Sequence, residues 1–353
     1  MSKQVLDSLF SCVYCSASQE VRMDKLGKSI PWMKAPTGGD DMEEWRSLRS
    51  RRDGKGGYVG ASSVPAILGH PASYQGAYET WAGIMGEKSR GFDQSMMNLM
   101  SLGHIMESHA LDALRNVVRY EWGHVFSEVG EYQWTVKHPE IDYFRVTPDG
   151  YAVIDDSVGV IELKYTERDF VPWMHLAKTG EILPGSKVER HWLQIQAQLA
   201  VTGLDWGILA GVVGARAGLR MVNGMDPEDG FVCVRVDRDP ETTDRIESAV
   251  VDFWSHVESG EPPRPNRHSD DRAVRRDLRD TVDGKEILRE DMAETVASAR
   301  GLASRISEMK KALGVVKAEI RLAMGDAEVM KVGDGEKPVT WKAKPKGGRL
   351  LLI

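Results

Sequence analysis

The sequence predicts an α/β protein in which helices flank a central mixed sheet, followed by a C-terminal helical and hairpin extension. Helical apolar spacing dominates up to about residue 119, and short runs of β-branched and aromatic residues separated by turns follow it. Beyond residue 265 the pattern changes again, to one long helix and a hairpin. We therefore divide the chain into a loosely attached N-terminal segment (1–42), a core (43–265) and an extension (266–353).

The core is expected to begin with helices and to continue with strands. Residues 75–88 and 96–119 place apolar side chains at helical spacing, and Ser62 or Ser63 could cap a further helix that begins near Val64. The later elements, in order, are strands at 125–137, 143–147, 151–154 and 158–165, a helix containing 191–201, strands at 206–213 and 231–236, and a helix at 240–259.

The extension begins after a proline-rich breaker that ends at Pro265. Within 285–325, apolar residues recur at alternating steps of four and three, which is the pattern of a coiled-coil seam. This seam suits an oligomer or partner interface, or a helix that packs back on its own core. Residues 329–344 predict a hairpin that turns at Asp334-Gly335.

Composition favours a cytoplasmic protein. No apolar run approaches the roughly 18 residues of a membrane span, and three cysteines suit a reducing compartment. Cys12 and Cys15 form a CxxC pair, but Cys233 stands alone, so the chain lacks the ligands for a closed zinc or iron–sulfur site. The net charge of −7 does not attract DNA, whereas residues 46–55 hold five cations that could bind phosphate locally.

Two short motifs predict a site for metal-dependent phosphodiester cleavage. Pro148-Asp149-Gly150 forms a turn, and Glu162-Leu163-Lys164 lies on the following strand. Because side chains alternate along a strand, Glu162 and Lys164 face one side and Leu163 points into the core. The two carboxylates and the Leu163 carbonyl offer oxygen ligands for Mg²⁺, and Lys164 can handle the attacking water or offset phosphate charge. The alternative is a β-hairpin with a surface glutamate and lysine.

A third carboxylate is expected from the helix at 96–119. Glu107 in Gly103-His-Ile-Met-Glu107 is placed where a helical side chain can reach over a sheet edge. His104, one turn earlier, could contact DNA or metal, or simply lie on the helix surface. We therefore predict Glu107, Asp149, Glu162 and Lys164 as catalytic, with Mg²⁺ as the metal and Mn²⁺ as a possible substitute.

Five ordered blocks give the chain a resemblance to a known family. It resembles the YqaJ-type viral recombinases, relatives of the phage lambda exonuclease within the PD-(D/E)xK superfamily, over roughly 43–265. The blocks are Trp45-Arg-Ser-Leu-Arg49, Gly60-Ala-Ser62 with Ile67-Leu-Gly69, Gly103-His-Ile-Met-Glu107, Thr147-Pro-Asp-Gly150 with Ile161-Glu-Leu-Lys164, and Gln194-Ile-Gln-Ala-Gln-Leu-Ala-Val-Thr202. Two positions depart from the pattern: Thr147 replaces a serine, and Ser63 stands where relatives often carry an acid.

The resemblance implies a restriction-endonuclease-like core and an exonuclease that digests duplex DNA from free 5′ ends. It implies 3′ tails for a single-strand annealing protein, and a phage or prophage origin in a bacterial cytoplasm. In such enzymes the residues matching Arg49, Ser62 and Gln194 lie near the 5′-terminal phosphate, and Gln196 is a secondary candidate. We expect a homo-oligomer.

Alternatives remain open at this stage. Gln194 and Gln196 could be plain helix residues, and Ser62 a cap. The same carboxylates would serve an endonuclease or a structure-specific repair nuclease. The seam would also suit a non-catalytic module that binds DNA ends or protein.

Overall fold

The computed structural model divides into two compact units, 1–279 and 280–353, which are described separately. The structure describes residues 33–34, 49–52, 55–86, 110–111, 114, 126–131, 134–166, 170–213, 231–278, 286–333, 338–343 and 349–352. The division falls later than the predicted boundary at 265, because helix α11 (His268–Asp277) packs on α5 (Ala77–Ile84) in the first unit. Within the predicted N-terminal segment, Met33–Lys34 forms strand β1 and pairs with β6 (Trp134–Lys137).

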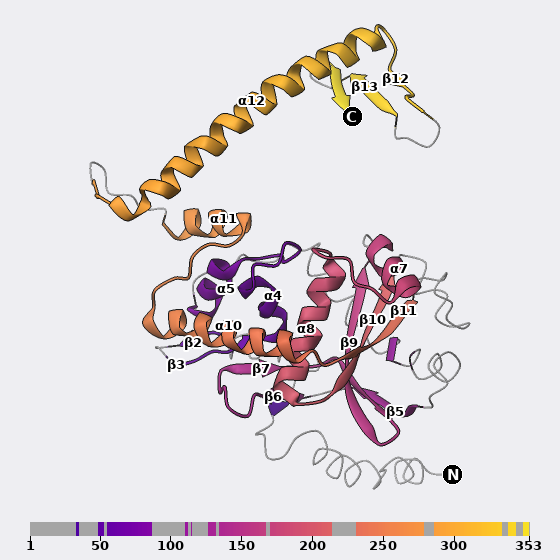
Figure 1. Ribbon diagram of the computed structural model, residues 1–353, viewed down its shortest axis with the longest axis vertical. Coiled ribbons are helices and arrows are strands. Elements are labelled where there is room, and N and C mark those ends of the chain that lie inside the picture. Colours follow the sequence, from indigo (N-terminus) through magenta and orange to yellow (C-terminus); the bar gives the residue numbers. More distant parts are fainter. Residues whose placement is uncertain are drawn as a thin grey trace, which may run out of the picture. The chain divides into compact units, whose positions relative to one another are not determined.

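The first unit is built on a five-stranded mixed sheet of order β11-β10-β9-β8-β5 (Figure 1). Its strands are β5 (Phe126–Glu131), β8 (Gly150–Ile154), β9 (Ser157–Thr166), β10 (Trp206–Val213) and β11 (Phe231–Asp237). β9 and β10 run parallel, and the other neighbours run antiparallel. The parallel pair is joined by a crossover that contains the helices α7 (Phe170–Thr179) and α8 (Lys187–Thr202).

Both faces of this sheet are covered. On one face Trp173 of α7 and Ile195 and Leu199 of α8 pack against strand residues such as Leu209. The Trp173 ring can lie this close to β10 because residue 211 is glycine, and a Cβ at that position would lie 2.7 Å from the ring. On the other face the helical residues Ala110, Leu111 and Leu114 pack against Ile161, Leu163 and Ile208. The predicted α/β fold, with a mixed sheet flanked by helices, is therefore confirmed.

A smaller sheet of order β1-β6-β7-β4 completes the first unit. It contains β4 (Val59–Gly60) and β7 (Phe144–Val146) and shares an apolar cluster with α5, α8 and α10 (Pro240–Ser259). The short elements beside it are β2 (Arg51–Arg52), β3 (Lys55–Gly56), the 3-10 turn η1 (Ala61–Ser63) and α4 (Val64–Ile67). The single strand predicted at 125–137 is wrong, because β5 and β6 belong to different sheets.

The second unit consists of one long helix and a small antiparallel sheet. Its elements are η3 (Glu290–Met292), α12 (Ala293–Met324), β12 (Val329–Met330), β13 (Val339–Ala343) and β14 (Arg349–Leu352). β12 and β13 confirm the predicted hairpin, whose turn residues lie outside the described range, and β14 adds an unpredicted third strand. None of the helices described in the chain has the length and apolar character that crossing a membrane requires.

Candidate active site

The pairing of β8 with β9 fixes Asp149 beside the Glu162-Leu163-Lys164 motif. The register sets Gly150 opposite Ile161, and the Asp149 amide donates to the Ile161 carbonyl at 3.1 Å. The Asp149 Oδ2 atom accepts from the Leu163 amide at 2.7 Å. One side chain and one backbone contact therefore hold the aspartate at the start of the strand.

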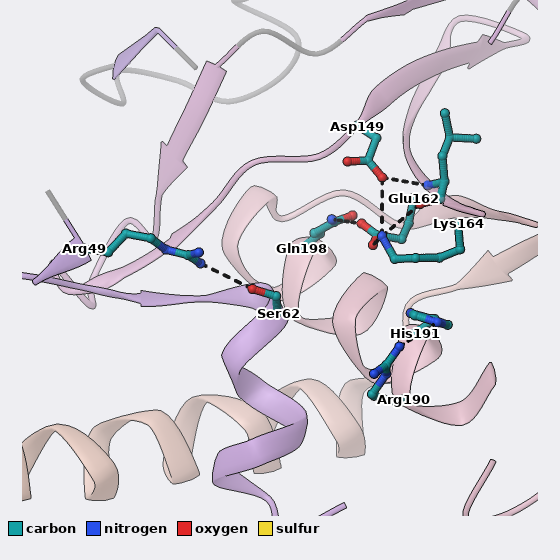
Figure 2. Close-up of polar contacts among 9 residues, drawn as sticks. Arg49, Ser62, Asp149, Glu162, Lys164, Arg190, His191 and Gln198 are labelled. Atoms are coloured by element: carbon teal, nitrogen blue, oxygen red, sulfur yellow. Dashed lines mark hydrogen bonds and ion pairs between the residues drawn. The ribbon is translucent and has the colours of Figure 1, made fainter. Parts of the chain in front are cut away.

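Alternation along β9 places Glu162 and Lys164 on the same side, as the sequence predicts. Leu163 points the other way and is buried in the apolar cluster beneath Ala110 and Leu111. The Lys164 ammonium forms an ion pair with Glu162 Oε1, lies 3.7 Å from Asp149 Oδ2 and donates to the Leu163 carbonyl at 2.9 Å (Figure 2). The two carboxylates and the lysine thus converge on one point of the sheet.

Glu162 is fully buried, and Gln198 of α8 supports it. The Gln198 Nε2 atom donates to Glu162 Oε2 at 2.5 Å, and neither side chain has any exposed surface. Burying a carboxylate is costly unless charge or hydrogen bonds compensate, and Lys164 and Gln198 supply both. Glu162 Oε1 faces the Lys164 ammonium, so a cation bound here would share this oxygen with the lysine.

These residues fit a divalent cation. Mg²⁺ prefers oxygen ligands supplied by one or two carboxylates, and Asp149, Glu162 and the Leu163 carbonyl provide such oxygens around one lysine. Among the described residues, no group of three or more acidic, histidine or cysteine side chains is placed to hold a metal ion. Glu107 and His104 lie outside the described residues, so the third carboxylate stays a prediction.

The glutamines of α8 separate into two faces. Gln196 is fully buried, donates to the Asp237 carbonyl at 2.9 Å and accepts from the Asp239 amide at 3.0 Å. Its amide therefore ties α8 to the junction between β11 and α10, and its role as a secondary DNA-contact candidate stays a prediction. Gln198, which the sequence analysis missed, lies four residues after the half-buried Gln194 and thus on the same helix face.

Arg49 and Ser62 meet beside the second sheet. The Arg49 Nη2 atom donates to Ser62 Oγ at 3.3 Å (Figure 2). Its guanidinium lies over the Tyr58 ring, 5.5 Å from the ring centroid. A Cβ on Gly60 would lie 2.0 Å from Nη2, so the glycine makes room for the guanidinium. Ser63, not Ser62, is the residue before α4, and its side chain makes no capping bond.

Comparison with known families agrees with this arrangement. The model of the YqaJ-like viral recombinase domain matches residues 44–205, which include Arg49, Asp149, Glu162, Lys164 and Gln194. Residues 44–205 are therefore similar to the YqaJ-like viral recombinase domain. No curated protein matches the chain.

Solved structures that resemble the chain include two of an alkaline exonuclease from Laribacter hongkongensis. One is 23% identical with a TM-score of 0.41, covering 66% of this chain and 98% of that one. The other, in complex with dAMP, is 22% identical with a TM-score of 0.42, covering 67% and 98%. A phage related exonuclease from Haemophilus somnus 129PT is 14% identical with a TM-score of 0.39, covering 61% and 97%.

A further polar pair lies near the amino end of α8. Arg190 Nη2 lies 3.0 Å from His191 Nε2, and a guanidinium can only donate, so Nε2 accepts and the ring proton is on Nδ1. Burial, followed by the charges of Arg190 and Lys164, holds the pKa of His191 well below its usual value. His191 is therefore neutral at neutral pH.

Proposed function

We propose that this protein is a divalent-metal-dependent deoxyribonuclease that hydrolyses DNA phosphodiester bonds from a free end. The observation that carries the proposal is the convergence of Asp149, Glu162 and Lys164, with the fully buried Glu162 carboxylate facing the lysine. A surface hairpin with a chance glutamate and lysine does not account for this geometry, because Glu162 is fully buried.

Each residue has a distinct chemical task. Asp149 and Glu162 would hold Mg²⁺ together with the Leu163 carbonyl, and Glu107 is proposed as a third ligand. The bound ion would polarise the phosphoryl oxygens and lower the pKa of water. Lys164 would orient the attacking water, accept its proton or offset charge that develops on the phosphate. Gln198 would hold Glu162 in its orientation beside Lys164.

End recognition is assigned to Arg49, Ser62 and Gln194. A guanidinium can bind phosphate through two hydrogen bonds, and a hydroxyl and an amide add neutral donors. We propose that these three hold the 5′-terminal phosphate, which gives 5′→3′ digestion and leaves 3′ tails. Such tails are substrates for a single-strand annealing protein, so we assign the chain to phage-type recombination in a bacterial cytoplasm, acting as a homo-oligomer.

Digestion of end-labelled linear duplex tests the proposal. Wild-type protein, Lys164→Ala and the exposed control Arg245→Ala are compared with Mg²⁺, with Mn²⁺ and with EDTA. We expect release of the 5′ label first, only with metal, in the wild type and in Arg245→Ala but not in Lys164→Ala. Earlier loss of the 3′ label would refute the polarity. Full activity of a folded Lys164→Ala protein would refute the assigned site.

A supercoiled plasmid, which has no free end, separates the competing functions. An exonuclease leaves it intact, whereas an endonuclease or a structure-specific nuclease using the same residues cuts it. Binding of linear duplex without any degradation under all metal conditions would favour a non-catalytic module.

A further inference from the structure

Arg190 is a buried cation that has no acidic partner among the described residues. The residue is 9% exposed, and no described carboxylate forms an ion pair with it. The adjacent acid, Glu189, instead contacts His70 Nε2 at 2.9 Å and accepts from the Gly185 amide. Buried arginines are rare unless paired, so the charge of Arg190 requires another explanation.

The partner that Arg190 does have preserves its charge. His191 accepts from the guanidinium and is kept neutral by burial and by the cations around it. A carboxylate in that position would cancel the positive charge, whereas a neutral imidazole orients the guanidinium without cancelling it. The His191 Nδ1–H is buried and has no partner among the described residues. The cluster therefore has an excess of donors and of positive charge.

The position of this cluster relates it to the candidate active site. Arg190, Gln194 and Gln198 follow one another at steps of four along α8, so they lie along one side of the helix. Lys164 and Lys187 are close enough for their charges to lower the pKa of His191. Figure 2 shows the Arg190–His191 pair apart from the Arg49–Ser62 pair, with Gln198 and the carboxylates also in view.

We propose that Arg190, oriented by His191, forms a second phosphate-binding site for the backbone of the DNA strand in the active site. This inference rests on the proposed function and adds a contact distinct from the Arg49–Ser62 pair. A phosphodiester supplies the anionic oxygens that Arg190 lacks, and a guanidinium matches their spacing.

Tyr74 forms part of the same site. Its ring lies over the Arg190 guanidinium at 4.1 Å, yet the tyrosine is 72% exposed. The ring covers one side of the cation and reduces its contact with water, which strengthens attraction to a phosphate. The outward side of the ring is a stacking surface for a base of the strand whose phosphate Arg190 binds.

The salt dependence of DNA binding tests the site. Wild-type protein, Arg190→Gln, Arg190→Lys and the control Arg245→Ala are titrated onto labelled duplex in EDTA, where cleavage is absent. Loss of one phosphate contact should make the slope of log Kobs against log salt shallower by about 0.9 for Arg190→Gln. Its affinity should fall by about tenfold. Arg190→Lys should keep the slope, and Arg245→Ala should match the wild type.

An unchanged slope and affinity for folded Arg190→Gln would overturn the site while leaving the nuclease proposal intact. Wild-type protein that binds DNA but never cleaves it would refute the nuclease proposal and leave the slope comparison valid. Wild-type protein that binds no DNA would overturn both.

A second measurement on unmodified protein covers the case in which Arg190→Gln does not fold. Inorganic phosphate titrated into ¹⁵N-labelled wild type should shift the side-chain resonances of Arg190 and His191 in a saturable manner. Resonances that do not move at any phosphate concentration would overturn the site.

Discussion

Replacing Gln198 with methionine isolates the support that α8 gives to Glu162. Methionine fills a similar volume but cannot donate a hydrogen bond, so the substitution removes the 2.5 Å contact and leaves the packing largely intact. Glu162 Oε2 then becomes a buried acceptor without its donor, next to the Lys164 ion pair. The carboxylate gains freedom to rotate away from the position in which it would hold a cation.

The contacts of Gln198 indicate how much Gln198→Met should weaken metal-dependent cleavage. A hydrogen bond to a charged group contributes about 1.5–3 kcal/mol, and both side chains are fully buried, so solvent does not weaken the contact. Loss of a group that orients a metal ligand typically costs about 10–100-fold in affinity or activity. That range corresponds to roughly 1.4–2.7 kcal/mol. The two estimates agree, and we expect the Mg²⁺ concentration for half-maximal cleavage to rise by about tenfold or more.

Gln196→Met is the matched control. Gln196 lies on the same helix and is equally buried, but its amide bonds only the backbone at Asp237 and Asp239. This variant should lower the melting temperature and leave the Mg²⁺ requirement unchanged. The assay is initial cleavage rate against Mg²⁺ concentration, with a thermal melt of each protein. Identical Mg²⁺ curves for wild type and a folded Gln198→Met protein would refute the positioning role.

Three further predictions concern the end-binding pair and His191. Arg49→Ala should slow cleavage of a 5′-phosphorylated duplex by about tenfold or more relative to its 5′-hydroxyl counterpart, and equal slowing of both in a kinetic comparison would remove Arg49 as the phosphate contact. Gly60→Ala should reproduce the loss of preference for a 5′-phosphate, because the new Cβ would displace the Arg49 guanidinium. The melting temperature should change little, since Gly60 has an extended backbone that alanine also adopts. An unchanged preference for the 5′-phosphate would contradict this. The pKa of His191 is depressed in the folded state, so the unfolded state binds a proton at higher pH than the folded state does. As the pH falls below about 6.5, the His191 contribution to the free energy of unfolding therefore decreases by about 1.4 kcal/mol per pH unit, until the folded pKa is reached. Chemical denaturation of wild type and His191→Gln between pH 8 and 4 measures this, and curves that stay parallel would exclude the His191 contribution.

Local patterns predicted the active-site strand well. The alternation of Glu162, Leu163 and Lys164 fixed which side each residue faces, and the structure confirms it. The helix around 191–201 and the strands flanking it were also confirmed, since long apolar or amphipathic runs are reliable local signals. Contacts between segments far apart in the sequence were harder to predict, because apolar periodicity does not identify the strand with which another strand pairs. That is why 125–137 was predicted as one strand.

The glutamines of α8 show the same limit. The family pattern drew attention to Gln194 and Gln196, but residues two apart lie on opposite sides of a helix. The four-residue spacing places Gln198 on the same helix face as Gln194, and this could have been read from the sequence. That Gln198 meets Glu162 and that Gln196 meets the β11–α10 junction depends on packing between elements. No local pattern reports such packing.

The spacing of residues along α8 has a consequence for how a DNA strand and the proposed cation ligands are aligned. Arg190 and Gln198 are eight residues apart, which is about 12 Å along the helix axis. One DNA strand advances by about 3.4 Å per nucleotide, so this interval corresponds to three or four nucleotides. Under the proposed role of Arg190, one helix therefore sets the distance between the bound phosphate and the carboxylate that Gln198 supports. The bound phosphate and the cleaved bond would then stay three or four nucleotides apart each time the strand moves forward.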